Sequence, residues 1–158
     1  MERNQEPDSQ VYINEIGDPK SYSEIVFCGY GEPTIRWDVV KDISQYVKTN
    51  GGKTRLNTNG HGNIINKKDI TPEMSGLIDV VSISLNTFDP KQYSELVGVE
   101  TSYFDEMIDF AKKSKPIVEK FVMTIVSIDD IDIERARKIT EEEIGAEFRI
   151  RDFFSSEV

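Results

Sequence analysis

Hydrophobic positions along the chain follow two alternating patterns, short apolar runs and longer stretches in which apolar residues recur every three or four positions. Short runs are typical of β-strands, and the longer spacing is typical of amphipathic helices. The runs predict strands over residues 23–28, 54–58, 80–85, 120–126 and 147–151. The helical spacing predicts helices over residues 9–16, 37–47 and 102–111, a further one from 133 to a stop at 145, and short helices beginning near residues 71 and 90.

Local signals set the ends of several of these elements. Asp8 is expected to cap the first helix and Gly17 to end it. Ser102 and Asp105 resemble a capping pair for the helix that they begin. The segment 25–28 is continuously apolar, which favours a strand buried on both faces.

The alternation of strands and helices indicates one α/β domain over residues 1–158, with a parallel sheet. Such a sheet is either open or curled into part of a barrel. Polar side chains occupy every second position in several strands, so each pair shares one face of the sheet. These pairs are Arg55 and Asn57, Ser82 and Ser84, and Arg149 and Arg151. Helices on both faces would bury these groups without partners, which is costly. The pattern therefore favours an incomplete TIM-like barrel with outer helices and a wet, ligand-filled interior.

The composition of the chain limits the kinds of molecule and metal site that it is expected to bind or form. The net charge of −10 disfavours nucleic acid, because an acidic chain repels phosphate backbones. No apolar stretch is long enough to span a membrane and the first residues lack the apolar core of a signal peptide, so a cytoplasmic location is expected. Cys28 is the only cysteine and His61 the only histidine, which excludes an intrachain disulfide and a metal site built from this chain's thiols or imidazoles alone. We expect Cys28 to be a small buried residue and His61 to be exposed.

The most informative segment for function is Gly29-Tyr30-Gly31-Glu32-Pro33, which follows the first predicted strand. Ligands of parallel α/β folds bind at the carboxyl ends of the strands. Glycines let a ligand approach the backbone, and Glu32 adds a carboxylate in a turn that Pro33 stiffens. This combination suits an ammonium group, which needs acceptors, and it repels phosphate. A nucleotide P-loop is excluded because the chain has no Gly-Lys-Ser/Thr.

The segment 27–33 resembles the Gly-Gly-Glu-Pro motif of radical S-adenosylmethionine (SAM) enzymes, in which this turn binds the methionyl ammonium. Residues 57–60 (Asn-Thr-Asn-Gly) and 82–86 (Ser-Ile-Ser-Leu-Asn) resemble the family's next two strand ends. With residues 148–151, the set looks most like the radical SAM proteins associated with TatD-type nucleases, whose function is not defined.

The resemblance implies a set of binding residues. Those expected to contact SAM are Gly29, Tyr30, Gly31, Glu32, Asn59, Ser84 and Asn86. Those expected to contact a substrate of unknown identity are Asn57, Arg149 and Arg151. The implied activity is reductive cleavage of SAM to a 5′-deoxyadenosyl radical that abstracts hydrogen, with a [4Fe–4S] cluster fed by an external electron donor.

The chain departs from this family in one respect. The family holds its cluster with three cysteines in a CxxxCxxC segment after the first barrel strand, and it would place that segment upstream of Met1. This chain alone is therefore expected to hold no metal and to be inactive. The missing strand would leave the edge at 25–28 open, which favours a homodimer. Two alternatives stay open: a non-enzymatic SAM-binding or interaction module, and an unrelated α/β nucleotide-binding domain.

Overall fold

The computed structural model describes residues 6–29, 31–127 and 130–152, in which five strands form one parallel sheet. The strands are β1 (Ile25–Phe27), β2 (Thr54–Thr58), β3 (Val80–Ser84), β4 (Lys120–Ser127) and β5 (Glu147–Asp152). They lie side by side in chain order, and every neighbouring pair is parallel. This sequential order confirms the predicted partial barrel, because an open doubly wound sheet reverses its strand order.

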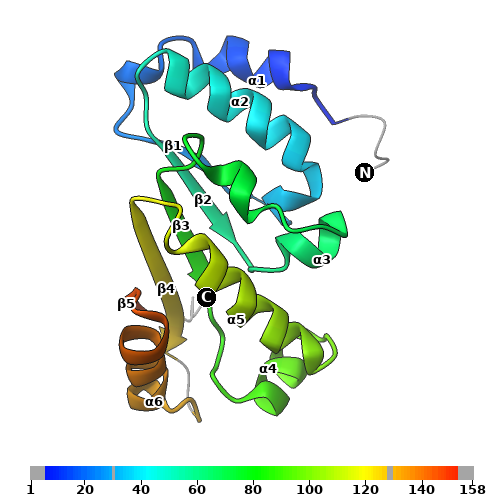
Figure 1. The fold of residues 1–158 in the computed structure, drawn as a ribbon, viewed down its shortest axis with the longest axis vertical. Helices are drawn as coiled ribbons and strands as arrows, with labels where there is room; N and C mark the ends of the chain where they lie inside the picture. Colours follow the sequence, from blue (N-terminus) through cyan, green and yellow to red (C-terminus); the bar gives the residue numbers. More distant parts are fainter. Residues whose placement is uncertain (1–5, 30, 128–129, 153–158) are drawn as a thin grey trace, which may run out of the picture.

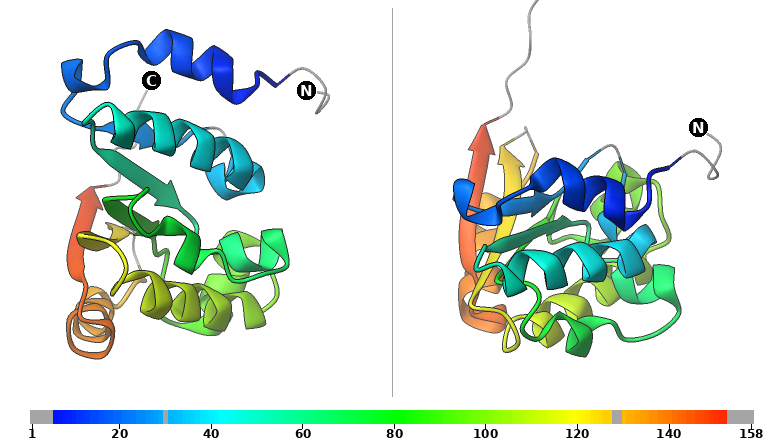
Figure 2. Two further views of the ribbon diagram at one scale, coloured as in Figure 1. Left: turned by 45° about the horizontal axis from the view of Figure 1, so that its top comes forward. Right: turned by 90° about the horizontal axis from the view of Figure 1, so that it is seen from above.

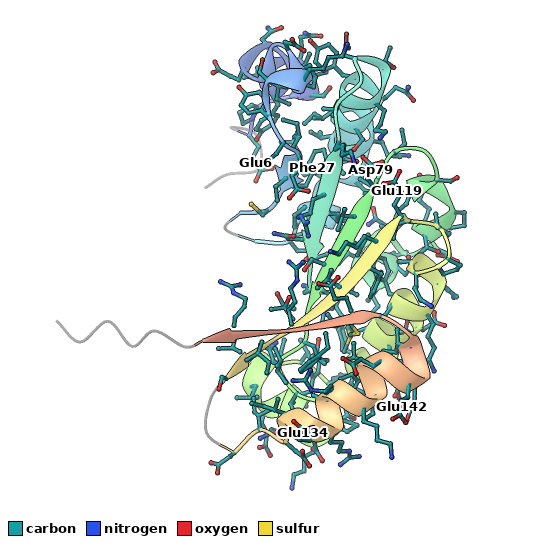
Figure 3. The ribbon with its side chains drawn as sticks, turned by 90° about the vertical axis from the view of Figure 1, so that its left-hand side faces the viewer. Glu6, Phe27, Asp79, Glu119, Glu134 and Glu142 are labelled. Atoms are coloured by element: carbon teal, nitrogen blue, oxygen red, sulfur yellow. The ribbon has the colours of Figure 1, made fainter. Side chains whose placement is uncertain are left out.

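Helices connect the strands and cover one face of the sheet (Figure 1). The α-helices are α1 (Ser9–Ile16), α2 (Trp37–Thr49), α3 (Gly62–Asn66), α4 (Pro90–Val97), α5 (Ser102–Ser114) and α6 (Ile133–Lys138), which continues into a π-helical turn, η5 (Ile139–Ile144). Three short 3₁₀ segments are η2 (Pro19–Ser21), η3 (Pro33–Arg36) and η4 (Thr71–Met74). The direction of the strands turns progressively from β1 to β5, so the sheet curves (Figure 2). Its other face carries no helix and is turned toward the viewer in Figure 3.

The core lies between the sheet and the helices. Alternate strand residues such as Leu56, Ile83 and Met123 are fully buried and pack with Phe110 of α5 and Trp37 of α2. A smaller cluster, centred on the α2 residues Val39, Ile43 and Val47, holds α1 against α2. The remaining strand positions face away from the helices, and this separation of apolar and polar faces follows from the twofold alternation of a strand.

Most predicted element ends are confirmed. Asp8 caps α1 by accepting a hydrogen bond from the Val11 N–H, and Gly17 ends the helix. The predicted cap at Ser102 is wrong, because Thr101 occupies the cap position of α5 and makes no side-chain capping hydrogen bond. The prediction that the first strand is buried on both faces is also wrong, since Val26 is exposed at the edge of a sheet with one covered face.

The described residues include no helix that is both long and apolar enough to cross a membrane.

Candidate functional site

The uncovered face of the sheet forms a groove with a volume of about 890 Å³. Its lining comes from β1 and the turn after it, and from β2, β3, β4 and β5. Strand register explains which side chains share this face: Asn57 pairs with Ser82, Ser84 with Thr124, and Thr124 with Arg149. We call this groove the open face. Eight predicted site residues line it, namely Gly29, Gly31, Glu32, Asn57, Asn59, Ser84, Arg149 and Arg151.

Two predicted site residues are not placed on the open face. Asn86 lies two positions beyond the end of β3 and is not part of the lining. Tyr30 lies outside the described residues. Most of the predicted site residues therefore lie together on the open face, and Asn86 does not line it.

The turn after β1 has a backbone that requires glycine. Gly29 has a φ of 150° and Gly31 a φ of 123°, both in the region that L-residues rarely adopt. A Cβ atom at either position would meet nothing within 4 Å. The need for glycine thus comes from conformation and not from crowding. Because the space beside both residues is open, a ligand can reach the main chain there.

The carboxylate of Glu32 joins this turn to the end of β2. Its Oε1 accepts hydrogen bonds from the Thr34 N–H at 3.2 Å, the Thr34 hydroxyl at 2.7 Å and the Thr58 hydroxyl at 2.6 Å. Its Oε2 accepts one from the Asn59 N–H at 2.8 Å. Glu32 also serves as the N-cap of η3. The side chain is therefore held in one orientation by groups from η3 and from the end of β2.

This network limits what Glu32 can still accept. A carboxylate offers about four lone-pair sites, and Oε2 has one partner among the described residues, so it retains acceptor capacity. An ammonium group carries three donors. Glu32 can take one of them, and exposed main-chain carbonyls of the glycine turn are the natural acceptors for the others.

Asn59 and His61 connect the open face to the helices behind it. The Asn59 side-chain oxygen accepts the His61 N–H at 2.9 Å. The His61 Nε2 lies 2.8 Å from the Tyr93 hydroxyl of α4, and the ring also hydrogen-bonds the main chain of Tyr103. If the other ring nitrogen donates to Tyr103, Nε2 is the acceptor of the Tyr93 hydroxyl proton. These hydrogen bonds link the end of β2 to α4 and α5.

The expectation that His61 is exposed is wrong, since its exposed fraction is 4%. Burial lowers the pKa of His61, against opposing effects of the Glu32 charge and the Tyr103 hydrogen bond. Burial also raises the pKa of Tyr93 to about 12. Both groups are therefore neutral at physiological pH. The sequence carries no signal for this pair, because Tyr93 lies on a helix 32 positions further along the chain.

The arginines of the open face lie toward both ends of the sheet. Arg55 on β2 donates from Nε to Glu24 at 2.7 Å. Arg149 on β5 donates from Nε to Glu147 at 2.8 Å. Arg151 lies two positions further along β5 and is exposed. Asn57 and Ser84 are exposed between these ends.

The described residues contain no group of three or more His, Cys, Asp or Glu that could hold a metal ion. Cys28, the single cysteine of the sequence, is exposed at the end of β1 and lines the open face, so the expectation that it is buried is wrong. A [4Fe–4S] cluster needs several thiolates. One cysteine does not supply them, and the residues of this chain therefore do not fit such a cluster.

Comparison with known proteins gives a family and several relatives. The family model described as Radical SAM superfamily matches residues 3–149. An uncharacterized protein of Methanocaldococcus jannaschii, MJ0804, is 30% identical over 111 residues, which is 70% of this chain and 36% of that protein. A probable GTP 3′,8-cyclase of Pyrobaculum aerophilum is 26% identical over 105 residues, which is 66% of this chain and 33% of that protein. The chain thus spans about a third of the length of these curated relatives.

Solved structures share the fold. SuiB of Streptococcus suis superposes with a TM-score of 0.70 at 19% identity, covering 98% of this chain and 36% of that one. SuiB bound to S-adenosylmethionine gives a TM-score of 0.51 at 17% identity, covering 93% and 42%. A domain of a pyruvate-formate lyase-activating enzyme from Bacteroides vulgatus gives 0.52 at 13% identity, covering 82% and 99%. At these identities the likeness concerns the fold alone.

Proposed function

The chain belongs to the radical SAM superfamily, and on that premise we propose that it binds S-adenosylmethionine on the open face as part of a radical-generating enzyme. The observation that carries the proposal is the geometry of the glycine turn. Glu32 lines the groove and is fixed by donors from η3 and the end of β2, with acceptor capacity left on Oε2. A fixed carboxylate beside exposed backbone is suited to the ammonium group of a zwitterion.

The other residues of the open face have complementary roles in this proposal. The main-chain carbonyls around Gly29 and Gly31 accept the remaining ammonium protons. Asn59 and Ser84, at the ends of β2 and β3, offer polar groups to the ribose or the carboxylate of SAM. Asn86 and Tyr30 are retained as predicted contacts from the family resemblance alone. When bound in an enzyme of this family, SAM supplies the group that abstracts hydrogen from the substrate.

Cleavage of SAM in this family depends on an electron from the cluster, and this chain has one cysteine. We therefore place the cluster ligands outside these 158 residues and assign this chain the binding, orientation and shielding of SAM. The expected result for the chain alone is that anaerobic treatment with iron and sulfide yields no cluster absorbance and no SAM cleavage. The same mismatch favours a second candidate, a SAM-binding module without redox chemistry.

The narrower identity of the enzyme belongs to this proposal too. The likeness to TatD-associated radical SAM proteins rests on the motifs at 27–33, 57–60, 82–86 and 148–151. The relative in Pyrobaculum aerophilum is described as acting on GTP, and it shares 26% identity over two thirds of this chain. A likeness at this level of identity does not specify the substrate of this chain.

Titration of SAM into isotope-labelled protein tests the proposal. We expect amide shifts at Gly31, Asn59 and Ser84, with none at residues of the outer helix surface such as Asp105 and Lys112. Adenosine titrated in parallel is the control, because it lacks the amino-acid moiety and should leave Gly31 unshifted. Shifts confined to the helix side of the sheet, or no shift at millimolar SAM, would overturn the proposed site.

A further inference from the structure

The open face is positively charged in an otherwise acidic protein. Its charged lining comprises Arg55, Arg149 and Arg151 against Glu24 and Glu32. Two other grooves of the described structure have the opposite balance. The groove beside β1 is lined by Glu6, Glu15, Glu24, Glu32 and Arg36. The groove between α4 and α6 is lined by Asp89, Lys91, Glu95, Asp130, Asp132 and Arg135. With a net charge of −10 over the chain, an excess of cations at one groove is a local feature that attracts anions.

The two acids of the open face are already engaged. Glu32 accepts hydrogen bonds from the turn and from β2. Glu24 accepts the Arg55 Nε–H, and this pair is partly shielded from solvent. Arg149 is paired with Glu147 through its Nε, so the excess positive charge of the groove is at its β5 end and is carried chiefly by Arg151.

Strand geometry places these two guanidinium groups for a shared ligand. Arg149 and Arg151 are two positions apart on β5, so they point to the same face roughly 7 Å apart along the strand. Thr124 of β4 stands opposite Arg149 and adds a hydroxyl to the same part of the groove. Arg149 uses its Nε for Glu147, which holds the side chain while its terminal amino groups have no hydrogen-bond partner among the described residues. Arg151 makes no ion pair with another described residue.

This end of the groove is distant from the proposed ammonium site. The order β1-β2-β3-β4-β5 puts three strands between β1 and β5. At about 4.8 Å for each strand spacing, the two ends are roughly 19 Å apart measured along the sheet. By strand order, the open face thus has a carboxylate and glycine turn near the β1 edge and a pair of guanidinium groups near the β5 edge.

We propose that Arg149 and Arg151, with Thr124, bind a carboxylate or phosphate group of the substrate, so that the substrate class is anionic. Guanidinium groups recognise both anions through paired N–H donors, and neither anion suits the Glu32 end of the groove. The inference rests on the proposed function, because it takes the β1 end of the groove for SAM and leaves the β5 end for the substrate.

Titration with sodium pyrophosphate and with glutarate, each at low ionic strength, tests this site and separates phosphate from carboxylate recognition. Arg149→Gln and Arg151→Gln each remove one cation from it. Arg135→Gln is the matched control, because it removes the same charge from the exposed surface of α6. We expect one of the two probes to bind with millimolar affinity, to bind about tenfold more weakly to either β5 variant, and to bind unchanged to the control.

Three results would overturn the inference: no binding of either probe, equal weakening in Arg135→Gln, or competition between the probe and SAM for one site. Competition would assign the arginines to the carboxylate of SAM. Binding of SAM is measured separately on the same variants, and we expect it to be unchanged. Loss of anion binding with SAM binding intact tests the substrate class alone, whereas failure of SAM to bind the wild-type chain contradicts the proposed function.

Discussion

At the scale of single residues, the buried His61 is the feature that departs most from expectation. Loops after strands are usually exposed, and nothing near His61 in the sequence indicates a partner. The glycines on either side of it are closely packed: a Cβ at Gly60 would lie 2.7 Å from Met107 of α5, and one at Gly62 would lie 2.8 Å from Ile70. Glu32 and its glycine turn were predictable, because their signal is local. The burial of His61 and the exposure of Cys28 depended on how elements that are distant along the chain are arranged.

The depressed pKa of His61 predicts how stability depends on pH. Above its ordinary value of 6.5, the ring is neutral in both the folded and the unfolded chain, so its contribution is fully present. As the pH falls through 6.5 the unfolded chain binds a proton that the folded chain does not, and the free energy of unfolding decreases. We expect His61→Gln to be less stable at pH 7 and to lose less stability between pH 7 and 5 than the wild type in urea denaturation.

Glu73 provides the internal comparison for that experiment. Hydrogen bonds from Lys41, Lys68 and Trp37 lower the pKa of its carboxyl to about 2. Its contribution is present above its ordinary value of 4.5 and is lost as the pH falls from there toward 2. The two losses of stability begin at different pH values, near 6.5 for His61 and near 4.5 for Glu73. A wild-type stability curve that is flat between pH 7 and 5, or one that His61→Gln leaves unaltered in slope, would contradict the role of His61.

At the scale of elements, strands and long helices were predictable because each carries its own periodicity. The bounds of β2 and α1 agree with the sequence pattern, and the other strands differ from it by a few residues at their ends. Three short elements, η2, η3 and α3, were not predicted, and neither was the π-helical geometry of η5 within the helix predicted from residue 133 to 145. The short helix α3 has too few residues for a period, and η5 departs from α-helical spacing within a continuous helix.

Asp79, which directly precedes β3, links that strand to α2 and β2 at the end of the sheet where the strands begin, away from the candidate site (Figure 3). Both of its carboxylate oxygens accept hydrogen bonds from Lys48 of α2, at 2.6 and 2.8 Å, and one also accepts the Thr54 N–H of β2 at 2.8 Å. Asp79→Ala leaves a buried backbone donor and a lysine without their partner. We expect the free energy of unfolding to fall by about 2–4 kcal/mol in chemical denaturation.

The matched control for this change is Glu119→Ala, at the same edge of the sheet but exposed. It should alter stability by no more than about 0.5 kcal/mol. The affinity for SAM should be unchanged in both variants, since the site lies at the other ends of the strands. A loss of SAM binding in folded Asp79→Ala protein would contradict this expectation, because it would show that a change where the strands begin alters binding where they end.

At the scale of the whole molecule, no strand among residues 6–29, 31–127 and 130–152 pairs with the outer edge of β1. A groove of about 650 Å³ runs beside it, lined by β1, α1 and α2. Large exposed apolar side chains gather there, namely Tyr12, Tyr22, Val26 and Ile35. Unpaired strand edges with apolar flanks favour association. The predicted homodimer through this edge therefore remains a prediction, now with a defined surface.

Sedimentation velocity tests the homodimer. We expect the wild type to associate at concentrations of tens of micromolar or above, and Ile35→Lys to shift it toward monomer. Leu96→Lys on α4 is the control, because Leu96 is about as exposed and lies outside the groove. A wild type that sediments as a monomer throughout the concentration range, or equal effects of both lysine substitutions, would rule out this surface.

Calorimetric titration of SAM into Glu32→Gln tests whether the turn after β1 binds the ammonium group of SAM. Glutamine keeps the shape of the side chain and removes its charge, and Thr58→Val controls for loss of one hydrogen bond to Glu32 while the carboxylate stays. We expect Glu32→Gln to weaken SAM binding about tenfold to a hundredfold, and Thr58→Val to weaken it less. Equal affinities of wild type and Glu32→Gln, with both proteins folded, would contradict it.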